Sequence, residues 1–271
     1  MGVIAIDWSG AKQPKAKLWL AEVNRGELRR LLPLSSREEA AAEIIRYCKQ
    51  THSAIIGLDF AFSMPAWFLA TNRLSTAFDL WALAEKEGER WLNECPPPFW
   101  GRPGRRKPVL QTHYRRTEEE VERINGIKPK SVFQVGGAGA VGTGSIRGMP
   151  MLRRIHDAGI SIWPFDSPSL PMVVEIYPRL LTGEVNKRSL EARKAFIDHP
   201  SRKWMDLPAG LRREVARSED SFDAAVSALV MARHRHELEQ LRSVSEEPYH
   251  LEGVIWAPRQ MNRFLGPHQE K

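Results

Sequence analysis

Val3-Ile4-Ala5-Ile6-Asp7, close to the start of a chain of 271 residues, is the stretch that decides the fold. An apolar run without polar alternation predicts a strand that is covered on both faces of a sheet. Asp7 then lies where the strand leaves the core. Aspartate also opens turns and caps helices. Because residues 17–23 predict another strand and not a helix, we favour a functional role for Asp7.

The next segments predict how the sheet is built around this first strand. Residues 17–23 and 27–34 are strand-like, and the tight turn Asn24-Arg25-Gly26 separates them, so the first three strands should form an antiparallel meander. A helical pattern then leads to a fourth buried strand, 54–59, which ends in Asp59. A helix between two strands implies a crossover, so this strand should lie parallel to the first. Both aspartates would then meet at the carboxyl edge, where open α/β sheets bind ligands.

Three further acids stand on buried elements. Glu175 lies inside the apolar strand 171–177, where a lone ionised carboxylate is costly and needs a cation, a hydrogen-bond network or a metal. Arg179 is the simplest partner for it. Asp220 and Asp223 share the first turn of a late helix. The helix dipole alone favours acids there, but the small apolar neighbours of Asp223 place it near the packing face.

Five acids are therefore candidate catalytic residues: Asp7, Asp59, Glu175, Asp220 and Asp223. Acids that converge repel one another, and a shared cation resolves the repulsion. Ligands that are oxygen only suit Mg²⁺ or Mn²⁺, and we predict Asp7, Asp59 and Asp223 as the metal ligands. Two such ions can activate a water and stabilise the leaving oxygen of a phosphodiester.

A long insertion at about residues 95–129 carries the densest basic stretch, from Arg102 to Arg116, with aromatic residues interleaved. The formal charge of the chain is +7, which mildly favours anionic partners. A solvated charge run is the ordinary explanation, but a phosphate-and-base contacting loop needs the same composition. We predict that the insertion covers the substrate edge, with Arg105 and Arg106 as nucleic-acid contacts.

Five glycines between Gly136 and Gly144 precede a helix expected over about 148–156. They leave backbone amides free to approach a substrate, although a flexible hinge would use the same residues. The stretch is neither a P-loop nor a dinucleotide fingerprint. The predicted substrate contacts outside the insertion are Gly137, Gly139, Gly142, Lys12, Arg147 and Arg179.

The composition sets the class of protein. No apolar run approaches the roughly 18 residues that span a bilayer, and the start of the chain lacks the pattern of a secretory signal. Two cysteines form neither a disulfide framework nor a metal pair. We therefore expect a cytoplasmic protein without membrane contact: one domain over 1–260 and a loose tail over 261–271.

Six motifs, taken in their order, resemble a known family. They are Ile-Asp-Trp-Ser-Gly-Ala, Gly-Leu-Asp-Phe-Ala, Val-Gly-Gly-Ala-Gly-Ala-Val-Gly-Thr-Gly, Glu-Ile-Tyr-Pro, Asp-Ser-Phe-Asp-Ala-Ala and Glu-Gly-Val-Ile-Trp-Ala-Pro. The set is similar to the predicted RNase H-like nucleases grouped as domain of unknown function 429, and the likeness runs from about Val3 to Pro258. The insertion is longer than that family leads us to expect.

The resemblance implies an α/β fold, a ribonuclease H-like mixed five-stranded sheet flanked by helices with a helical and loop insertion. It implies an acidic divalent-metal site, with Asp7 as the first-strand acid, Asp59 as the fourth-strand acid and Glu175 as the acid of Glu-x-Tyr-Pro. Asp220 and Asp223 match the late pair, which is also similar to the helix acids of RuvC-type junction resolvases. The implied activity is a metal-dependent nuclease acting on DNA or RNA.

Two other functions remain open on the sequence. One is an ATP-dependent phosphotransferase or ATPase of the actin and sugar-kinase kind, because residues 7–12 loosely resemble the first phosphate loop of those enzymes. Such enzymes usually duplicate the core, and this chain has one copy of the strand-and-aspartate pattern. The other is a non-catalytic module that binds nucleic acid through its positive charge; the retained acids disfavour it.

Overall fold

The computed structural model describes the chain apart from residues 1, 111, 138, 206, 262–263 and 265–271. Most of the predicted tail over 261–271 therefore lies outside the described residues. The described elements, in chain order, are β1 (Gly2–Asp7), β2 (Trp19–Asn24), β3 (Glu27–Pro33), α1 (Arg37–Gln50), β4 (Ile55–Leu58), α2 (Ala66–Thr71), α3 (Ala77–Glu94), α4 (Arg116–Glu120), α5 (Gly142–Asp157), β5 (Ser161–Ile162), β6 (Met172–Ile176), α6 (Pro178–Thr182), α7 (Leu190–Asp198), the 3-10 helix η1 (Pro200–Met205), α8 (Ala209–Ala216), α9 (Glu219–Arg233), α10 (Arg235–Glu239), α11 (Tyr249–Glu252) and β7 (Ile255–Trp256).

One mixed sheet organises the molecule, with strands in the order β3-β2-β1-β4-β6-β5 and β7 paired to β6. β1 pairs antiparallel with β2, and β2 with β3, so the predicted meander is confirmed. β4 lies parallel to β1, as the crossover through α1 requires, and β6 lies parallel to β4. The α/β class with a mixed sheet flanked by helices is thereby confirmed.

The predicted count of five strands is wrong, because the sheet has seven. The two additional strands, β5 and β7, have two residues each and both run parallel to β6. β5 pairs with Met172 and Val173, whereas β7 pairs with Glu175 and Ile176. The outer side of β6 is therefore covered in two short pieces.

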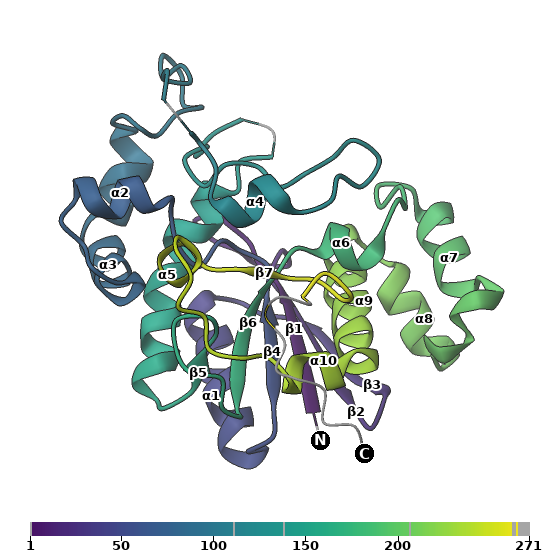
Figure 1. The fold of residues 1–271 in the computed structure, drawn as a ribbon. Helices are drawn as coiled ribbons and strands as arrows, with labels where there is room; N and C mark the ends of the chain where they lie inside the picture. Colours follow the sequence, from purple (N-terminus) through teal and green to yellow (C-terminus); the bar gives the residue numbers. More distant parts are fainter. Residues whose placement is uncertain (1, 111, 138, 206, 262–263, 265–271) are drawn as a thin grey trace.

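Helices cover both faces of the sheet (Figure 1). α1 and α5 contact each other on one face, and α3 packs on α5 from outside. α9 lies on the other face against β1 and β2, with α6 and α8 beside it. Alternate residues of β1 serve the two layers: Ile4 and Ile6 point to the α1 and α5 layer, whereas Val3 and Ala5 point to α9.

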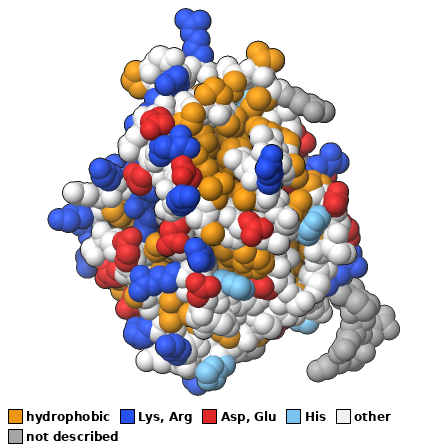
Figure 2. All heavy atoms as spheres, turned by 90° about the vertical axis from the view of Figure 1, so that its left-hand side faces the viewer, with side chains coloured by type: hydrophobic (Ala, Val, Ile, Leu, Met, Phe, Trp, Pro, Cys, Tyr) orange, Lys and Arg blue, Asp and Glu red, His pale blue; other side chains and the backbone are white. Residues whose placement is uncertain are grey.

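The insertion lies across the carboxyl edge of the sheet, where α4 is seen above the strand ends in Figure 1. Among the described residues of the insertion, α4 is the helix, and it has five residues. The side of the molecule seen in Figure 2 has blue Lys and Arg side chains scattered among red Asp and Glu, with no single basic patch. No helix in the described part of the chain has the length and apolar character needed to cross a membrane.

α5 begins six residues before the expected helix, so Gly142, Gly144 and Gly148 are helical. The glycines serve close packing at these positions. A Cβ on Gly142 would collide with the carbonyl oxygen of Val132, and one on Gly148 would lie 2.5 Å from the ring of Phe60. The glycine-rich stretch is thus part loop and part helix, and the flexible-hinge interpretation is wrong for its second half.

Candidate functional site

The parallel pairing of β1 and β4 brings Asp7 and Asp59 together. Ile6 is in register with Leu58, so the residue after each lies at the same height on the carboxyl edge. The backbone N–H of Asp59 donates to the carbonyl of Ile6 over 3.2 Å, which continues the ladder past the end of β4. Both side chains are partly exposed at this edge. The sequence prediction that these two acids meet is confirmed.

α9 supplies the third acid. Ser218 caps this helix by accepting a hydrogen bond from the N–H of Ser221. Asp223 follows in the next turn and is 7% exposed. Its neighbours Ala224 and Ala225 are fully covered against the sheet, so the helix backbone approaches β1 and β2 closely. Asp223 therefore faces the strand ends, as its small neighbours predict.

The three carboxyl groups interact through their charges. Burial raises the pKa of Asp7 well above its ordinary value, and the Asp223 and Asp59 carboxylates raise it further. Burial also raises the pKa of Asp59 to about 8, with Asp223 adding to the effect and Lys187 opposing it. Burial raises the pKa of Asp223 as well. Three acids that repel one another in this way lack sufficient positive charge.

Lys187 is the cation of the cluster. It lies in the segment between α6 and α7, and its Nζ forms an ion pair with Oδ2 of Asp223. The two side chains are 13% and 10% exposed, so water screens the pair poorly. The other oxygen of Asp223, Oδ1, is buried and has no hydrogen-bond partner among the residues that the structure describes. A buried carboxylate oxygen without a donor is costly, so this atom is suited to a cation or a donor from a ligand.

Asp7, Asp59 and Asp223 have the donor chemistry that Mg²⁺ or Mn²⁺ requires, since all of them offer carboxylate oxygen. In the part of the chain that the structure describes, no three Asp, Glu, His or Cys side chains form a ready-made metal-binding group. The acids are nevertheless close enough for the charge of Asp223 to raise the pKa of Asp7 and Asp59, and Oδ1 of Asp223 marks where a ligand would be gained.

A cavity of about 610 Å³ opens beside the cluster at the carboxyl edge of the sheet. Asp59 and Asp220 are among its lining residues, and Lys17 and Lys130 add positive charge to its wall. Burial raises the pKa of Asp220, and its neighbour Glu219 adds to this. The cavity is open to solvent and has room for a phosphate group with its attached sugar, which gives a substrate access to Asp59.

The glycine-rich segment forms one wall of this cavity. Gly139 and Gly144 both line it, and the aliphatic part of Lys130 lies beside Gly139. Gly139 has φ +73°, a conformation that glycine adopts without strain. Gly142 begins α5 and is packed behind the wall, whereas Gly137 is exposed and does not line the cavity. Of the three predicted glycine contacts, the structure places one at the cavity.

Glu175 lies at the same edge but is already neutralised. Oε1 accepts from Nη2 of Arg115 at 2.5 Å, and Oε2 accepts from Nη1 at 2.8 Å and from the N–H of Phe62 at 2.9 Å. The suggested partner, Arg179, is wrong: its guanidinium donates to the carbonyls of Gly183 and Val185. The sequence could not reveal Arg115, which is 60 residues away on the insertion.

Arg115 joins the insertion to the sheet. The side chain is 0% exposed and also donates through Nε to Glu118 at 3.0 Å and through Nη1 to the carbonyl of Glu252 at 2.9 Å. Burial raises the pKa of Glu118 to about 7, although the charge of Arg115 acts in the opposite direction. One buried arginine therefore compensates two buried glutamates, Glu175 and Glu118.

Most predicted cationic contacts lie away from the cavity. Lys12 is exposed near Glu89, and Arg147 donates a hydrogen bond from Nη1 to the carbonyl of Gly10 at 2.6 Å. Arg105 lines a separate hollow beside α3, and Arg106 is exposed on the same loop. These side chains do not line the cavity in the structure, so the prediction that they contact substrate there is not supported by their positions.

Several residues at the site were not anticipated: Lys17, Lys130, Tyr177 and Lys187. Burial raises the pKa of Tyr177 to about 12, and Asp59 contributes to the rise, so the phenol stands beside the cluster. Tyr177 has a sequence signal, because it belongs to the Glu-Ile-Tyr-Pro motif. The lysines have none, since nothing in their local sequence distinguishes them from solvated surface lysines.

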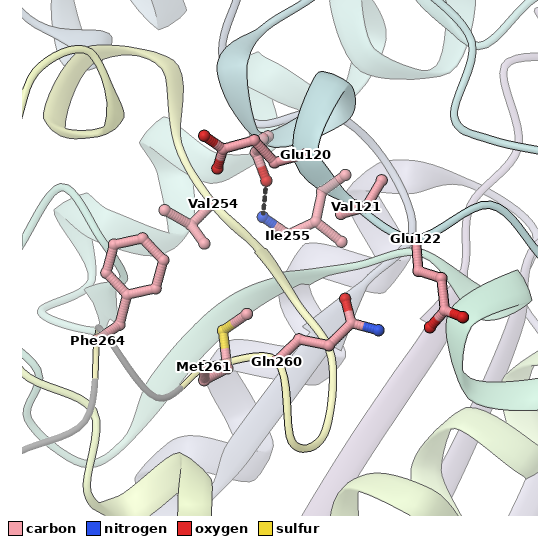
Figure 3. A pocket seen from close by; sticks show the side chains of 9 residues that line it. Glu120, Val121, Glu122, Val254, Ile255, Gln260, Met261 and Phe264 are labelled. Carbon is pink, nitrogen blue, oxygen red and sulfur yellow. Dashed lines mark hydrogen bonds between the residues drawn. The ribbon is translucent and has the colours of Figure 1, made fainter.

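A second hollow of about 560 Å³ lies between α4 and β7 (Figure 3). Val254, Met261 and Phe264 form its apolar side, and the N–H of Ile255 donates to Thr117 at 2.9 Å beside it. The described residues that line this hollow include no lysine or arginine. A phosphate is therefore better matched to the cavity beside Asp59.

Comparisons of this chain with protein-family models, curated proteins and solved structures find no match.

Proposed function

We propose that the protein is a divalent-metal-dependent phosphodiesterase that cleaves nucleic acid. One observation carries the proposal: carboxylates from β1, β4 and α9, far apart in the sequence, meet at the carboxyl edge of the sheet, where the charge of Asp223 raises the pKa of both Asp7 and Asp59. Structural acids are usually paired off, as Glu175 is. A cluster left short of positive charge beside an open cavity is typical of a site that gains a cation.

Asp7, Asp59 and Asp223 would hold Mg²⁺ or Mn²⁺. The chemistry that such an ion supplies is activation of water and stabilisation of negative charge on phosphate oxygens. The chain's own residues perform the remaining tasks: Lys17 and Lys130 on the cavity wall attract the phosphodiester backbone. Gly139 and Gly144 let the substrate approach the main chain of that wall closely.

We assign the fold to the ribonuclease H-like superfamily, and the chain to the RNase H-like nucleases of domain of unknown function 429, as part of the same proposal. The antiparallel meander, the parallel fourth strand and the late helix that bears Asp223 support this assignment. Asp7 and Asp59 end the two central strands, as the resemblance implies.

The test is cleavage of labelled single- and double-stranded DNA and RNA with Mn²⁺, Mg²⁺ or EDTA. We expect cleavage that requires the metal and falls about a thousandfold in Asp7→Asn, the loss of several kcal/mol of transition-state stabilisation. The matched control is Asp198→Asn, which removes an acid 60% exposed on α7. Cleavage that survives Asp7→Asn would exclude this site as its source.

The alternatives give different results in the same preparation. Micromolar binding of ATP with Mg²⁺ in calorimetry, without cleavage, would favour a phosphotransferase that uses the glycine-rich wall. Salt-dependent binding of nucleic acid without any metal requirement would favour a non-catalytic module.

A further inference from the structure

A hydrogen bond to its backbone carbonyl holds Lys187 beside the acid cluster. The buried side chain of Arg193, on α7, donates to the backbone carbonyl of Lys187 and, at 2.9 Å, to the carbonyl of Ala216 at the end of α8. The main chain of Lys187 is thus fixed to α7 and α8. Its ammonium group then reaches Oδ2 of Asp223.

The two oxygens of Asp223 have different surroundings. Oδ2 pairs with Lys187, whereas Oδ1 is buried and finds no partner in the described part of the chain. Asp223 is also the carboxylate with the largest charge effect on both Asp7 and Asp59. Oδ2 of Asp223 is therefore neutralised by a cation of the protein. Oδ1 is part of the acid cluster, which lacks a cation.

The charges favour one ion over two. As metal ligands all three acids would be ionised and carry −3. Lys187 carries +1, which leaves −2, the charge that a single divalent ion neutralises. Two further groups at the border of the cluster, Arg179 and Asp220, carry opposite charges and act on the pKa of Asp223 in opposite directions. A second divalent ion would have to displace the ammonium group or lie against it, which is electrostatically unfavourable.

We propose that Lys187 takes the place of a second metal, so that this site holds one divalent ion on Asp7, Asp59 and Oδ1 of Asp223, with the lysine as a fixed positive charge beside it. The inference rests on the proposed metal-dependent function and deepens it. Lys187 acts through Asp223 and is a positioning residue that sets the number and affinity of the bound ions.

The experiment counts bound Mn²⁺ by the loss of the free-ion signal in electron paramagnetic resonance, which needs no substrate. It compares the full chain with Lys187→Met, Lys187→Gln and Lys194→Met. Lys194 is the matched control because it is a lysine of α7, close in sequence, that pairs with Glu191 and is 51% exposed. Thermal unfolding of each variant verifies folding, and the glutamine variant keeps a hydrogen-bond donor at the position if methionine is not tolerated.

We expect one equivalent of Mn²⁺ in the unmodified chain and in Lys194→Met. Loss of the charge at Lys187 should lower the Kd for Mn²⁺ about tenfold or more, or add a second equivalent. Two equivalents in the unmodified chain, or Lys187 variants that match Lys194→Met, would overturn the inference and leave the proposed function standing. Absence of Mn²⁺ binding in all four proteins would overturn the proposed function itself.

Discussion

Glu175 on β6 and Asp223 on α9 are both buried acids at the carboxyl edge of one sheet, and their surroundings differ sharply. Both oxygens of Glu175 are bonded, to Arg115 and to the N–H of Phe62. Asp223 has one oxygen on Lys187 and one with no partner. The comparison separates acids that fasten the fold from acids that are free to take a ligand, although the sequence presents them alike.

The largest effect on stability is expected from removal of Arg115, the cation that neutralises Glu175. Arg115→Met leaves Glu175 and Glu118 buried without their cation, and we expect the free energy of unfolding to fall by about 3–5 kcal/mol. The adjacent Arg116 is the control: its side chain is 55% exposed in its pair with Glu120, so Arg116→Met should cost less than about 1 kcal/mol. Denaturant unfolding measures both variants. Equal losses would show that Arg115 is no more important than a surface arginine.

The pH dependence of stability tests the second buried glutamate that pairs with Arg115, Glu118. Its pKa is about 7 in the folded protein and 4.5 without the fold, so the folded state holds the proton more tightly. The contribution of Glu118 to stability is therefore highest below pH 4.5 and is lost as the pH rises towards 7. We expect Glu118→Gln, which cannot ionise, to gain about 2–3 kcal/mol relative to the unmodified chain between pH 5 and pH 8.

Denaturant unfolding of the two proteins across that range gives the difference directly. Other titrating groups are common to both proteins and cancel. A difference that stays constant with pH, or that falls as the pH rises, would contradict the raised pKa of Glu118.

The smallest effect on stability is expected in the acid cluster, which lacks positive charge. Asp59→Asn removes a charge that burial and Asp223 disfavour, so in EDTA at pH 8 the variant should be more stable than the unmodified chain by at least about 1 kcal/mol. Mn²⁺ should then stabilise the unmodified chain and not the variant. Thermal unfolding with and without Mn²⁺ checks both statements. A destabilised Asp59→Asn in EDTA would mean that this acid is a structural one.

Much of the architecture and part of the site could be predicted from the sequence. Buried strands that end in Asp7 and Asp59, and a helix between them, are local patterns whose consequence in space is fixed by the right-handed crossover. Small residues around Asp223 likewise predict the face on which it lies. These inferences depend on short-range periodicity, which can be recognised directly in a sequence.

The remainder depends on contacts between distant segments. The pairing of Glu175 with Arg115 spans 60 residues, and that of Lys187 with Asp223 spans 36. Neither cation differs in its local sequence from the solvated lysines and arginines around it. The pairing of β7 with β6 likewise joins segments that are far apart in the sequence.

The hydrogen bonds of Glu252 bear on the order in which parts of the molecule fold during synthesis. Its two carboxylate oxygens accept from the N–H of Ala66, at the start of α2, and from the N–H of Arg116, at the start of α4. During translation this residue leaves the ribosome long after both of those helices and after α9. A nascent chain can therefore bring Asp7, Asp59 and Asp223 together before the hydrogen bonds from the starts of α2 and α4 to Glu252 form.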